Sequence, residues 1–354
     1  MKHIAIIGAG ITGLVLAREL QRQGDWQVSI FEKSRGLGGR LSTRRTGQHS
    51  FDHGAPFFTA RSAAFQQFLK PYIADGTVAD WHPRVVTLAP GREPYGRPWF
   101  EPHYVGVPQM NSLCKALAQD LVIHTGVTVT GISGRPGNWL LQTLPPEPIL
   151  ETAEPIGPFH WVVSTVPAEQ AGHLLPAVVT PNVLSRVQFD PCFSLQLPFL
   201  VEAPLAAGKR HAGQLPFAAA VVQHSPLAWL CFNQRKPGRN QCCSLVVQST
   251  GDWARQHLAT PLPEVQQQLL AALVQLLGPQ FLDGLDSAGV SLHRWRYARA
   301  TQAFQQALVA DVGAGLAAGG DWCLGGGVEA GYLSAVAMAA MLGDTAKSSA
   351  SPAP

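Results

Sequence analysis

The chain opens with two short apolar runs separated by a glycine-rich break and a stretch of helical periodicity. The first run, residues 4–7, leads directly into Gly8-Ala9-Gly10-Ile11-Thr12-Gly13. Apolar residues then recur at helical spacing over 14–20, which is typical of an amphipathic helix. The second run, residues 28–32, ends in an acidic residue. This order predicts a strand–helix–strand unit over residues 3–32.

The glycines of this unit occupy the positions that a dinucleotide-binding turn requires. Gly8 permits the tight turn, Gly10 lets the backbone approach a pyrophosphate, and Gly13 lets the helix pack closely on the strand. The N–H groups at the start of the helix point at the phosphates, and Glu32 is placed to accept hydrogen bonds from ribose hydroxyls. The candidate nucleotide-binding residues here are Gly8, Gly10, Ile11, Thr12, Gly13, Glu32 and Lys33.

The residues after Glu32 distinguish FAD from a nicotinamide cofactor. This segment ends in Gly38-Gly39-Arg40, which a nicotinamide dehydrogenase does not need. In flavoproteins that resemble glutathione reductase, such a segment lies along the FAD pyrophosphate. The guanidinium of Arg40 has the charge and the fork geometry that bind phosphate in bidentate fashion. Gly39 and Arg40 are therefore candidate FAD-binding residues.

A second glycine-rich stretch, residues 318–331, lies near the other end of the chain. It contains Gly319-Gly320-Asp321 and leads into a helix predicted to begin near Val328. Flavoproteins of this kind close the cofactor site from the C-terminal end: the aspartate binds a ribityl hydroxyl and the helix N-terminus faces the flavin carbonyl. We expect the two glycine-rich segments to build one FAD site, to which this end contributes Gly320, Asp321, Val328 and Glu329.

Periodicity predicts most of the remaining elements. Helices are expected near 62–72, from 108–112 onward, and over 263–277. Strands are expected at 121–124, 127–132, 161–167, 193–197, 244–248 and 293–298, with short strands over 84–106 and a hairpin with a long loop over 133–158. Val127 lies in a strand of the type that holds the adenine by its backbone in flavoproteins, and it is a further candidate for cofactor binding.

These elements predict an α/β fold with a discontinuous nucleotide-binding domain. Residues 1–60, 107–168 and 290–343 are expected to form a Rossmann-like FAD-binding domain of the p-hydroxybenzoate hydroxylase or glutathione reductase type. Residues 61–106 and 169–289 are expected to form an inserted, mostly antiparallel α+β substrate domain, and residues 344–354 a disordered tail. The active site is expected where the domains meet, over the flavin ring.

Composition narrows the function further. The 354 residues carry a formal net charge of +3, too small to indicate nucleic-acid binding, and arginines gather at Arg35, Arg40, Arg44 and Arg45, which suits phosphates. No apolar run is long enough to span a bilayer, and residues 1–10 do not resemble a signal peptide. The six cysteines show no zinc-ligand spacing. We therefore expect a metal-free, cytoplasmic enzyme with free thiols.

Several segments resemble those of bacterial renalases, over residues 3–340. The similarity is carried by Gly38-Gly39-Arg40, Phe58-Thr59-Ala60-Arg61, Ser225-Pro226-Leu227-Ala228-Trp229-Leu230, Asn233 with Lys236-Pro237-Gly238-Arg239, His293-Arg294-Trp295-Arg296-Tyr297-Ala298 and Gly320-Asp321-Trp322-Cys323-Leu324. The His-Arg-Trp and Lys-Pro-Gly-Arg segments are much more specific than the glycines. Renalases resemble flavin amine oxidases in sequence and have the fold of p-hydroxybenzoate hydroxylase.

The resemblance implies an activity and a set of site residues. Renalases hold FAD non-covalently and oxidise the 2- and 6-dihydro isomers of NAD(P)H to NAD(P)+. The hydride goes to flavin N5, and dioxygen then reoxidises the flavin to give hydrogen peroxide.

By this resemblance the residues expected to contact FAD include Thr12, Arg40, Ala55, Pro56 and Phe57. Those expected to border the dihydronicotinamide are Phe57, Asn233, Trp295 and Arg296.

The chemistry of this reaction suits such residues. A dihydropyridine becomes aromatic when it loses hydride, so the site needs alignment against flavin N5 rather than a strong base. Trp295 and Phe57 would provide flat walls that exclude water. Asn233 would bond the carboxamide, and Arg296 would meet a ribose or phosphate.

Three sites in the sequence depart from the renalase pattern. Pro56-Phe57 stands in place of a Gln-Tyr pair, Gln248 in place of a histidine, and Gly327 in place of an arginine. Because these changes alter polar contacts near one pocket, two alternatives stay open. One is a flavin amine oxidase or desaturase that acts on an apolar or cationic substrate. The other is a non-catalytic flavin-binding protein that serves as a redox sensor or assembly partner.

Overall fold

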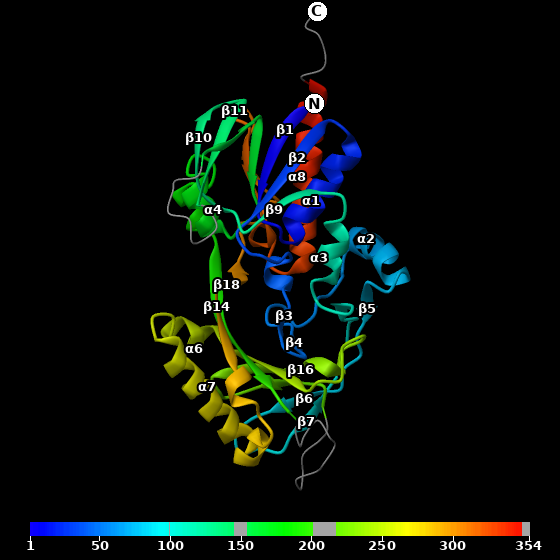
Figure 1. Ribbon diagram of the computed structural model, residues 1–354, viewed down its shortest axis with the longest axis vertical. Coiled ribbons are helices and arrows are strands. Elements are labelled where there is room, and N and C mark those ends of the chain that lie inside the picture. Colours follow the sequence, from blue (N-terminus) through cyan, green and yellow to red (C-terminus); the bar gives the residue numbers. More distant parts are fainter. Residues whose placement is uncertain (99, 145–153, 201–216, 349–354) are drawn as a thin grey trace, which may run out of the picture. The chain divides into compact units, whose positions relative to one another are not determined.

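The computed structural model describes residues 1–98, 100–144, 154–200 and 217–348 (Figure 1). The chain divides into two compact units, each discontinuous in sequence. Unit 1 comprises residues 1–41, 114–189 and those from 300 onward, and unit 2 comprises residues 42–113 and 190–299. These bounds differ from the expected domains. Residues 42–60, 107–113 and 290–299 belong to unit 2, and residues 169–189 belong to unit 1.

Unit 1 is built on a six-stranded, mostly parallel sheet in the order β19-β20-β13-β1-β2-β9. Its strands are β1 (Lys2–Ile7), β2 (Trp26–Glu32), β9 (Val122–Thr125), β13 (Trp161–Ser164), β19 (Val309–Asp311) and β20 (Leu316–Ala318). Only β19 runs antiparallel to its neighbour. Helices α1 (Ile11–Gln23) and α8 (Val328–Ser348) pack against each other beside β1 and β2 (Figure 1). The predicted strand–helix–strand unit and the α/β class are confirmed.

A second, three-stranded antiparallel sheet completes unit 1, with two short helices. The strands are β10 (Thr128–Arg135), β11 (Asn138–Leu144) and β12 (Ile156–Phe159), and the helices are α4 (Ala168–Leu174) and α5 (Pro181–Leu184). Helix α3 (Ser112–Leu117) contains the boundary between the units. The predicted hairpin over 133–158 is present as β11 and β12, which pair antiparallel, while residues 145–153 of its expected loop lie outside the described residues.

Unit 2 is built on a seven-stranded sheet in the order β18-β14-β17-β16-β15-β6-β7. The strands are β6 (Val85–Leu88), β7 (Tyr95–Arg97), β14 (Gln188–Pro198), β15 (Ala219–Val222), β16 (Leu227–Phe232), β17 (Ser244–Ser249) and β18 (Ser291–Gln302). Two small sheets join β3 (Arg44–Thr46) to β4 (His49–Phe51) and β5 (Val78–Asp80) to β8 (Tyr104–Gly106). The helices are α2 (Ala63–Ala74), α6 (Gly251–Gln256) and α7 (Leu262–Leu277), with 3-10 turns at Pro279–Leu282 and Ser287–Gly289.

The two faces of the seven-stranded sheet differ because side chains alternate along each strand. One face packs against α6 and α7 and holds the apolar core of unit 2, with Phe193, Leu195, Leu230 and Val247 fully buried (Figure 1). The opposite face, called the second face below, carries the intervening residues: Ser194, Gln196, Trp229, Cys231, Ser244, Val246, Gln248, Ser291, His293 and Trp295. Residues 49–57 run across this second face, with His49 bonded to Ser244 and Phe57 packed on Trp229.

Two features of the ends and helices complete the fold. Helix α8 continues to Ser348, so residues 344–348 are helical rather than part of a disordered tail, and residues 349–354 lie outside the described residues. Within the described ranges, no helix combines the length and the hydropathy needed to cross a bilayer.

Candidate functional site

The N-terminal glycine turn has the geometry of a phosphate-binding loop. Gly8 has φ +107°, a conformation that side chains disfavour. A Cβ at Gly13 would overlap the carbonyl oxygen of Gly8, whereas Gly10 faces open space. Gly10 is also the N-cap of α1 and supplies no side-chain cap. The first N–H groups of α1 therefore have no partner within the helix and lie beside space that a phosphate can enter.

Glu32 ends β2 with its carboxylate turned back toward this loop. It is 7% exposed. Its Oε2 accepts from the Ala9 N–H at 2.9 Å and its Oε1 accepts from the Ser34 N–H at 2.8 Å. Lys33 next to it is exposed. The Val127 N–H already donates to the Glu32 carbonyl at 3.0 Å, so Val127 lies at the expected place but its amide hydrogen is engaged by the protein.

The Gly-Gly-Arg segment packs directly on the turn. The Gly38 N–H donates to the Ala9 carbonyl at 3.0 Å, and a Cβ at Gly39 would lie 3.6 Å from Gly10 Cα. Arg40 follows in the 3-10 turn Gly39–Leu41. Two segments separated by nearly thirty positions in sequence thus form one surface lined by backbone N–H groups and a guanidinium.

Arg40 forms a bidentate ion pair with Asp321 from the second glycine-rich stretch. Arg40 Nη1 donates to Asp321 Oδ2 at 2.8 Å and Nη2 donates to Oδ1 at 2.6 Å. From the sequence, Arg40 was expected to bind a phosphate and Asp321 a ribityl hydroxyl. In the structure the two side chains bind each other. Asp321 opens the 3-10 turn Asp321–Cys323 and is 6% exposed. The Gly327 N–H also donates to its Oδ2, at 3.3 Å.

The start of α8 lies against the start of α1. A Cβ at Gly331 would come within 2.9 Å of Thr12 Oγ1 and of Ile11. Val328 is buried and Glu329 is half-buried in this first turn, while Gly320 donates its N–H to Ser334 Oγ at 2.9 Å. The structure therefore brings together both glycine-rich segments that the sequence assigned to one site. Open glycine surfaces, helix N–H groups and the Arg40 guanidinium fit the diphosphate of a dinucleotide such as FAD.

In unit 2, three side chains of different elements hold the segment 50–54. Asn233 Nδ2 donates to the Ser50 carbonyl at 2.9 Å, from the 3-10 turn Asn233–Arg235 that follows β16. Trp295 Nε1 donates to the His53 carbonyl at 2.9 Å, and Gln248 Nε2 donates to the Gly54 carbonyl at 2.6 Å. We call these three side chains the backbone clamp. It fixes the segment that leads directly into Ala55, Pro56 and Phe57.

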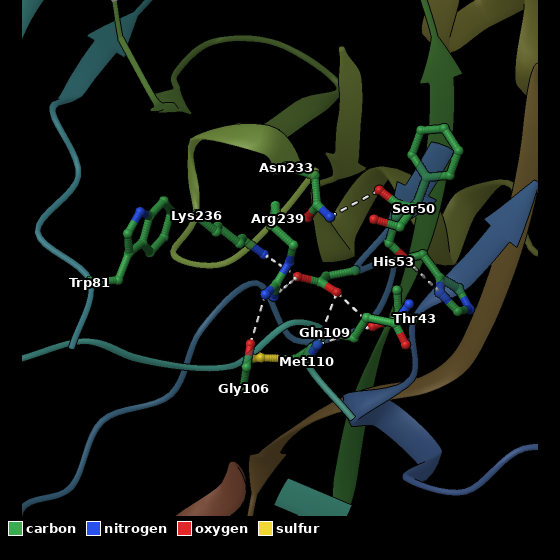
Figure 2. Close-up of polar contacts among 12 residues, drawn as sticks. Thr43, Ser50, His53, Trp81, Gly106, Gln109, Met110, Asn233, Lys236 and Arg239 are labelled. Atoms are coloured by element: carbon green, nitrogen blue, oxygen red, sulfur yellow. Dashed lines mark hydrogen bonds and ion pairs between the residues drawn. The ribbon is translucent and has the colours of Figure 1, made fainter. Parts of the chain in front are cut away.

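The structure places the expected substrate contacts as follows. Asn233 is 1% exposed and its Nδ2 donates to the Ser50 carbonyl (Figure 2), while its Oδ1 is buried without a hydrogen-bond partner among the described residues, so its contact with a ligand stays a prediction. Trp295 and Arg296 are neighbours on β18 and therefore point to opposite faces of the sheet. Trp295 lies on the second face, where its ring is close to that of His53. Arg296 is exposed and lies on the opposite face, where the Arg294 guanidinium packs over the Phe193 ring. The two side chains cannot border one ring together.

Phe57 lies in a group of aromatic rings on unit 2. Its ring centroid is 4.3 Å from that of His103, 5.7 Å from Trp229 and 6.3 Å from Trp81. Phe57, like Ala55 and Pro56, is half-buried, whereas His103 and Trp81 are buried. Phe57 and Trp229 meet at 59°, so they form a corner rather than a pair of parallel walls.

Asp52 is the centre of a buried ionic cluster that the sequence did not predict. Figure 2 labels its partners Thr43, Met110, Lys236 and Arg239. Its Oδ2 accepts from Lys236 Nζ at 2.9 Å and from Arg239 Nη2 at 2.7 Å. Its Oδ1 accepts from Thr43 Oγ1 at 2.6 Å and from the Met110 N–H at 3.2 Å. The side chains of Asp52, Lys236 and Arg239 are at most 1% exposed. One carboxylate is thus the counter-ion of two buried cations.

The ionisation of this region follows from burial and from those cations. Burial alone would raise the pKa of the Asp52 carboxyl, but the charges of Lys236 and Arg239, with hydrogen bonds from Arg239 and Thr43, hold that pKa well below its usual range. Burial also lowers the pKa of His53 to about 4, helped by the neighbouring His293 and the charge of Arg44. Asp52 is therefore ionised and His53 neutral at physiological pH.

Replacing Asp52 by asparagine leaves two buried cations without a counter-ion, and we expect this variant to lose about 3–5 kcal/mol of unfolding free energy at neutral pH. Because the pKa of Asp52 is depressed in the folded protein, its stabilisation is present above about pH 4 and disappears as the pH falls further. Denaturant titrations of Asp52→Asn and wild type should therefore converge in acid.

The exposed Arg61–Glu101 pair provides the control for this measurement. Its side chains are 73% and 37% exposed, and such pairs contribute little to stability. Glu101→Gln should leave the unfolding free energy almost unchanged. Equal losses in Asp52→Asn and Glu101→Gln would contradict the stabilising role of the cluster.

Known proteins share parts of this arrangement. Residues 6–72 match the family model described as an NAD(P)-binding Rossmann-like domain, and residues 99–342 match that of flavin containing amine oxidoreductase. A 1-hydroxycarotenoid 3,4-desaturase from Flavobacterium sp. is 46% identical over 59 residues, which are 17% of this chain and 12% of that protein. A 4,4'-diapophytoene desaturase from Staphylococcus haemolyticus is 47% identical over 51 residues, 14% and 10% of the two chains. The matched part thus spans about an eighth or less of these relatives.

Solved structures resemble the whole chain. A putative protoporphyrinogen oxidase from Exiguobacterium sp. 255-15 has a TM-score of 0.71 at 14% identity and covers 97% of this chain and 98% of its own. Cyclohexylamine oxidase from Brevibacterium oxydans IH-35A has a TM-score of 0.70 at 13% identity, covering 97% and 99%. At these identities the likeness establishes the fold. Together with the family match over 99–342, it makes the chain an FAD-dependent oxidoreductase that belongs to the flavin-containing amine oxidoreductase family.

Proposed function

We propose that this protein is an oxidase of isomeric dihydro-NAD(P), which converts the 2- and 6-dihydronicotinamide forms to NAD(P)+. Bound FAD would supply the redox chemistry by accepting a hydride at N5 and passing the electrons to dioxygen, with hydrogen peroxide as product. The nicotinamide ring loses the hydride and becomes an aromatic pyridinium; hydrogen peroxide takes up the two electrons, the transferred hydrogen and one proton from solvent, so atoms and charge balance. The observation that supports this proposal is the aromatic second face of unit 2, whose positions named above carry no carboxylate.

The second face suits a neutral ring that gives up hydride. Phe57, Trp229 and Trp295 offer flat surfaces there, and none of the second-face positions named above carries a carboxylate. Asp52, which lies in the segment that crosses this face, is already engaged by two cations. A hydride donor needs alignment and exclusion of water rather than proton abstraction.

The histidines of this region fit the same chemistry. The pKa of His53 is about 4, and burial lowers the pKa of His103 and of His293. A histidine with a pKa near 4 is a weak base at neutral pH. A protonated amine would have to lose a proton before oxidation, and these residues give it neither a counter-ion nor an effective base.

A flavin amine oxidase or desaturase is the second candidate. The observation that favours it is the group of rings formed by Phe57, Trp81, Trp229 and His103, which would suit an apolar substrate. The two candidates differ in the substrate that reduces the cofactor, so direct reduction of the flavin decides between them.

Anaerobic stopped-flow mixing tests the proposal. Flavin-saturated protein mixed with 6-dihydro-NAD or 2-dihydro-NAD should lose its flavin absorbance within seconds, while cyclohexylamine should leave it unchanged. Admission of oxygen should restore the absorbance and release hydrogen peroxide. No bleaching by either isomer would overturn the proposal, and bleaching by the amine alone would establish the second candidate.

The backbone clamp generates a second prediction, for Gln248. Gln248→Glu keeps the shape of the side chain but removes the N–H donor to the Gly54 carbonyl, which would let the segment before Phe57 shift. Because small misplacements in a reacting complex are costly, we expect the limiting rate of flavin reduction to fall by roughly tenfold to a hundredfold. Flavin content should stay near that of wild type.

Gln248→His is the matched control, since an imidazole N–H again provides a donor. We expect it to recover most of the limiting rate in the same stopped-flow experiment. If the glutamate variant reduced its flavin at the wild-type limiting rate and changed only the apparent affinity for substrate, the clamp would have no positioning role.

A further inference from the structure

The guanidinium of Arg44, a residue of unit 2, has no hydrogen bond or ion pair among the described residues. It lies on β3, opposite Phe51 of β4, and it is only half-buried. By contrast, Lys236 and Arg239 both bind Asp52. Arg44 therefore holds a guanidinium close to the segment 50–54 without a protein anion to match it.

Three rings lie together beside this cation. The ring centroids of His293 and Trp295 are 4.3 Å apart, those of His53 and His293 are 5.1 Å apart, and those of His53 and Trp295 are 5.3 Å apart. The imidazole ring of His293 likewise has no hydrogen bond among the described residues. The chain brings Arg44 to this cluster, because Ser42, two residues before it, has its Oγ 3.4 Å from His53 Nε2. Burial lowers the pKa of both histidines, and the charge of Arg44 lowers it further.

The charges that act on this ring cluster are unbalanced. His53 and His293 are neutral at physiological pH, and the charged groups that act on them are Arg44 and Asp52. Lys236 and Arg239 already bind Asp52. The three cations Arg44, Lys236 and Arg239 therefore have a single carboxylate, that of Asp52, as their counter-ion. Positive charge in a partly buried place is costly unless an anion pairs with it. The region thus favours an anionic ligand and disfavours a protonated amine.

We propose that Arg44 and His293 form a subsite for an anionic oxygen group of the substrate, a phosphate or carboxylate, beside the Trp295 ring. The guanidinium would donate in bidentate fashion, and neutral His293 would donate its ring N–H. This inference rests on the proposed function and specifies its substrate class: a ring that donates hydride and carries a negative group, as the pyrophosphate of a dinucleotide does. A free phosphate or pyrophosphate presents the same anionic oxygens to these donors as a dinucleotide does, so such compounds are suitable probes.

Calorimetric titration with inorganic pyrophosphate tests the subsite. The protein is saturated with FAD, so that the cofactor's own phosphate sites are filled. Wild type should bind pyrophosphate, and Arg44→Gln should bind it at least about tenfold more weakly, which is the usual effect of losing a charged hydrogen bond. Arg44→Lys keeps the charge but not the fork and should fall between the two.

Arg45 provides the matched control. It is adjacent in sequence but points to the other side of β3, where it lines an open pocket of about 550 Å³ with Gln48 and Asn240. Arg45→Gln should bind pyrophosphate as tightly as wild type. Equal weakening in Arg44→Gln and Arg45→Gln would show a general effect of charge and would overturn the subsite.

The remaining outcomes are equally decisive. If wild type bound no pyrophosphate, or if Arg44→Gln bound it as well as wild type, the subsite would be wrong. If Arg44→Gln lost FAD while Arg44→Lys bound pyrophosphate like wild type, Arg44 would serve the cofactor instead. Because pyrophosphate binding needs no turnover, failure of the dihydronicotinamide isomers to bleach the flavin would reject the proposed function alone.

Discussion

The ion pair between Arg40 and Asp321 is the contact on which unit 1 depends as a cofactor site. The two residues are 281 positions apart in sequence, and each belongs to a glycine-rich segment with little side-chain surface of its own. Their bidentate contact places the Gly-Gly-Arg segment, the first turn of α1 and the start of α8 around one space. A guanidinium has five N–H donors, and the bidentate pair with Asp321 uses two of them and orients the Arg40 side chain.

In unit 2 the corresponding constraint is the attachment of residues 49–57 to the second face. The backbone clamp holds three carbonyls of this segment, and the Asp52 cluster anchors it between Lys236 and Arg239. One amide hydrogen of Asn233, a side chain that the resemblance assigned to a ligand, holds the Ser50 carbonyl.

Local patterns in the sequence predicted much of the fold. The glycine spacing, the run before Gly8 and the acidic end at Glu32 predicted β1, α1 and β2, since each depends only on nearby residues. The unit boundaries were harder: β14 and β18 are continuous strands that contain the boundaries at 189/190 and 299/300, so no linker composition marks them. The opposite directions of Trp295 and Arg296, however, follow from strand alternation and were available in the sequence.

Contacts between distant residues account for what the sequence did not show. Asp52 meets Lys236 and Arg239 across 184 and 187 positions, and Gln248 meets Gly54 across 194. Nothing in the local sequence of Asp52 distinguishes it from an ordinary surface aspartate. Only the burial of the Lys-Pro-Gly-Arg turn against residues 43–54 turns it into the shared acceptor of two cations.

The most direct test is a double-mutant cycle on FAD affinity. Dissociation constants are measured by flavin fluorescence for wild type, Arg40→Ala, Asp321→Ala and the double variant. If the ion pair joins the two glycine-rich segments into one site, each single variant weakens FAD binding and the double variant loses much less than the sum of both. Strictly additive losses, or a wild-type protein that stays colourless in excess FAD, would contradict this account.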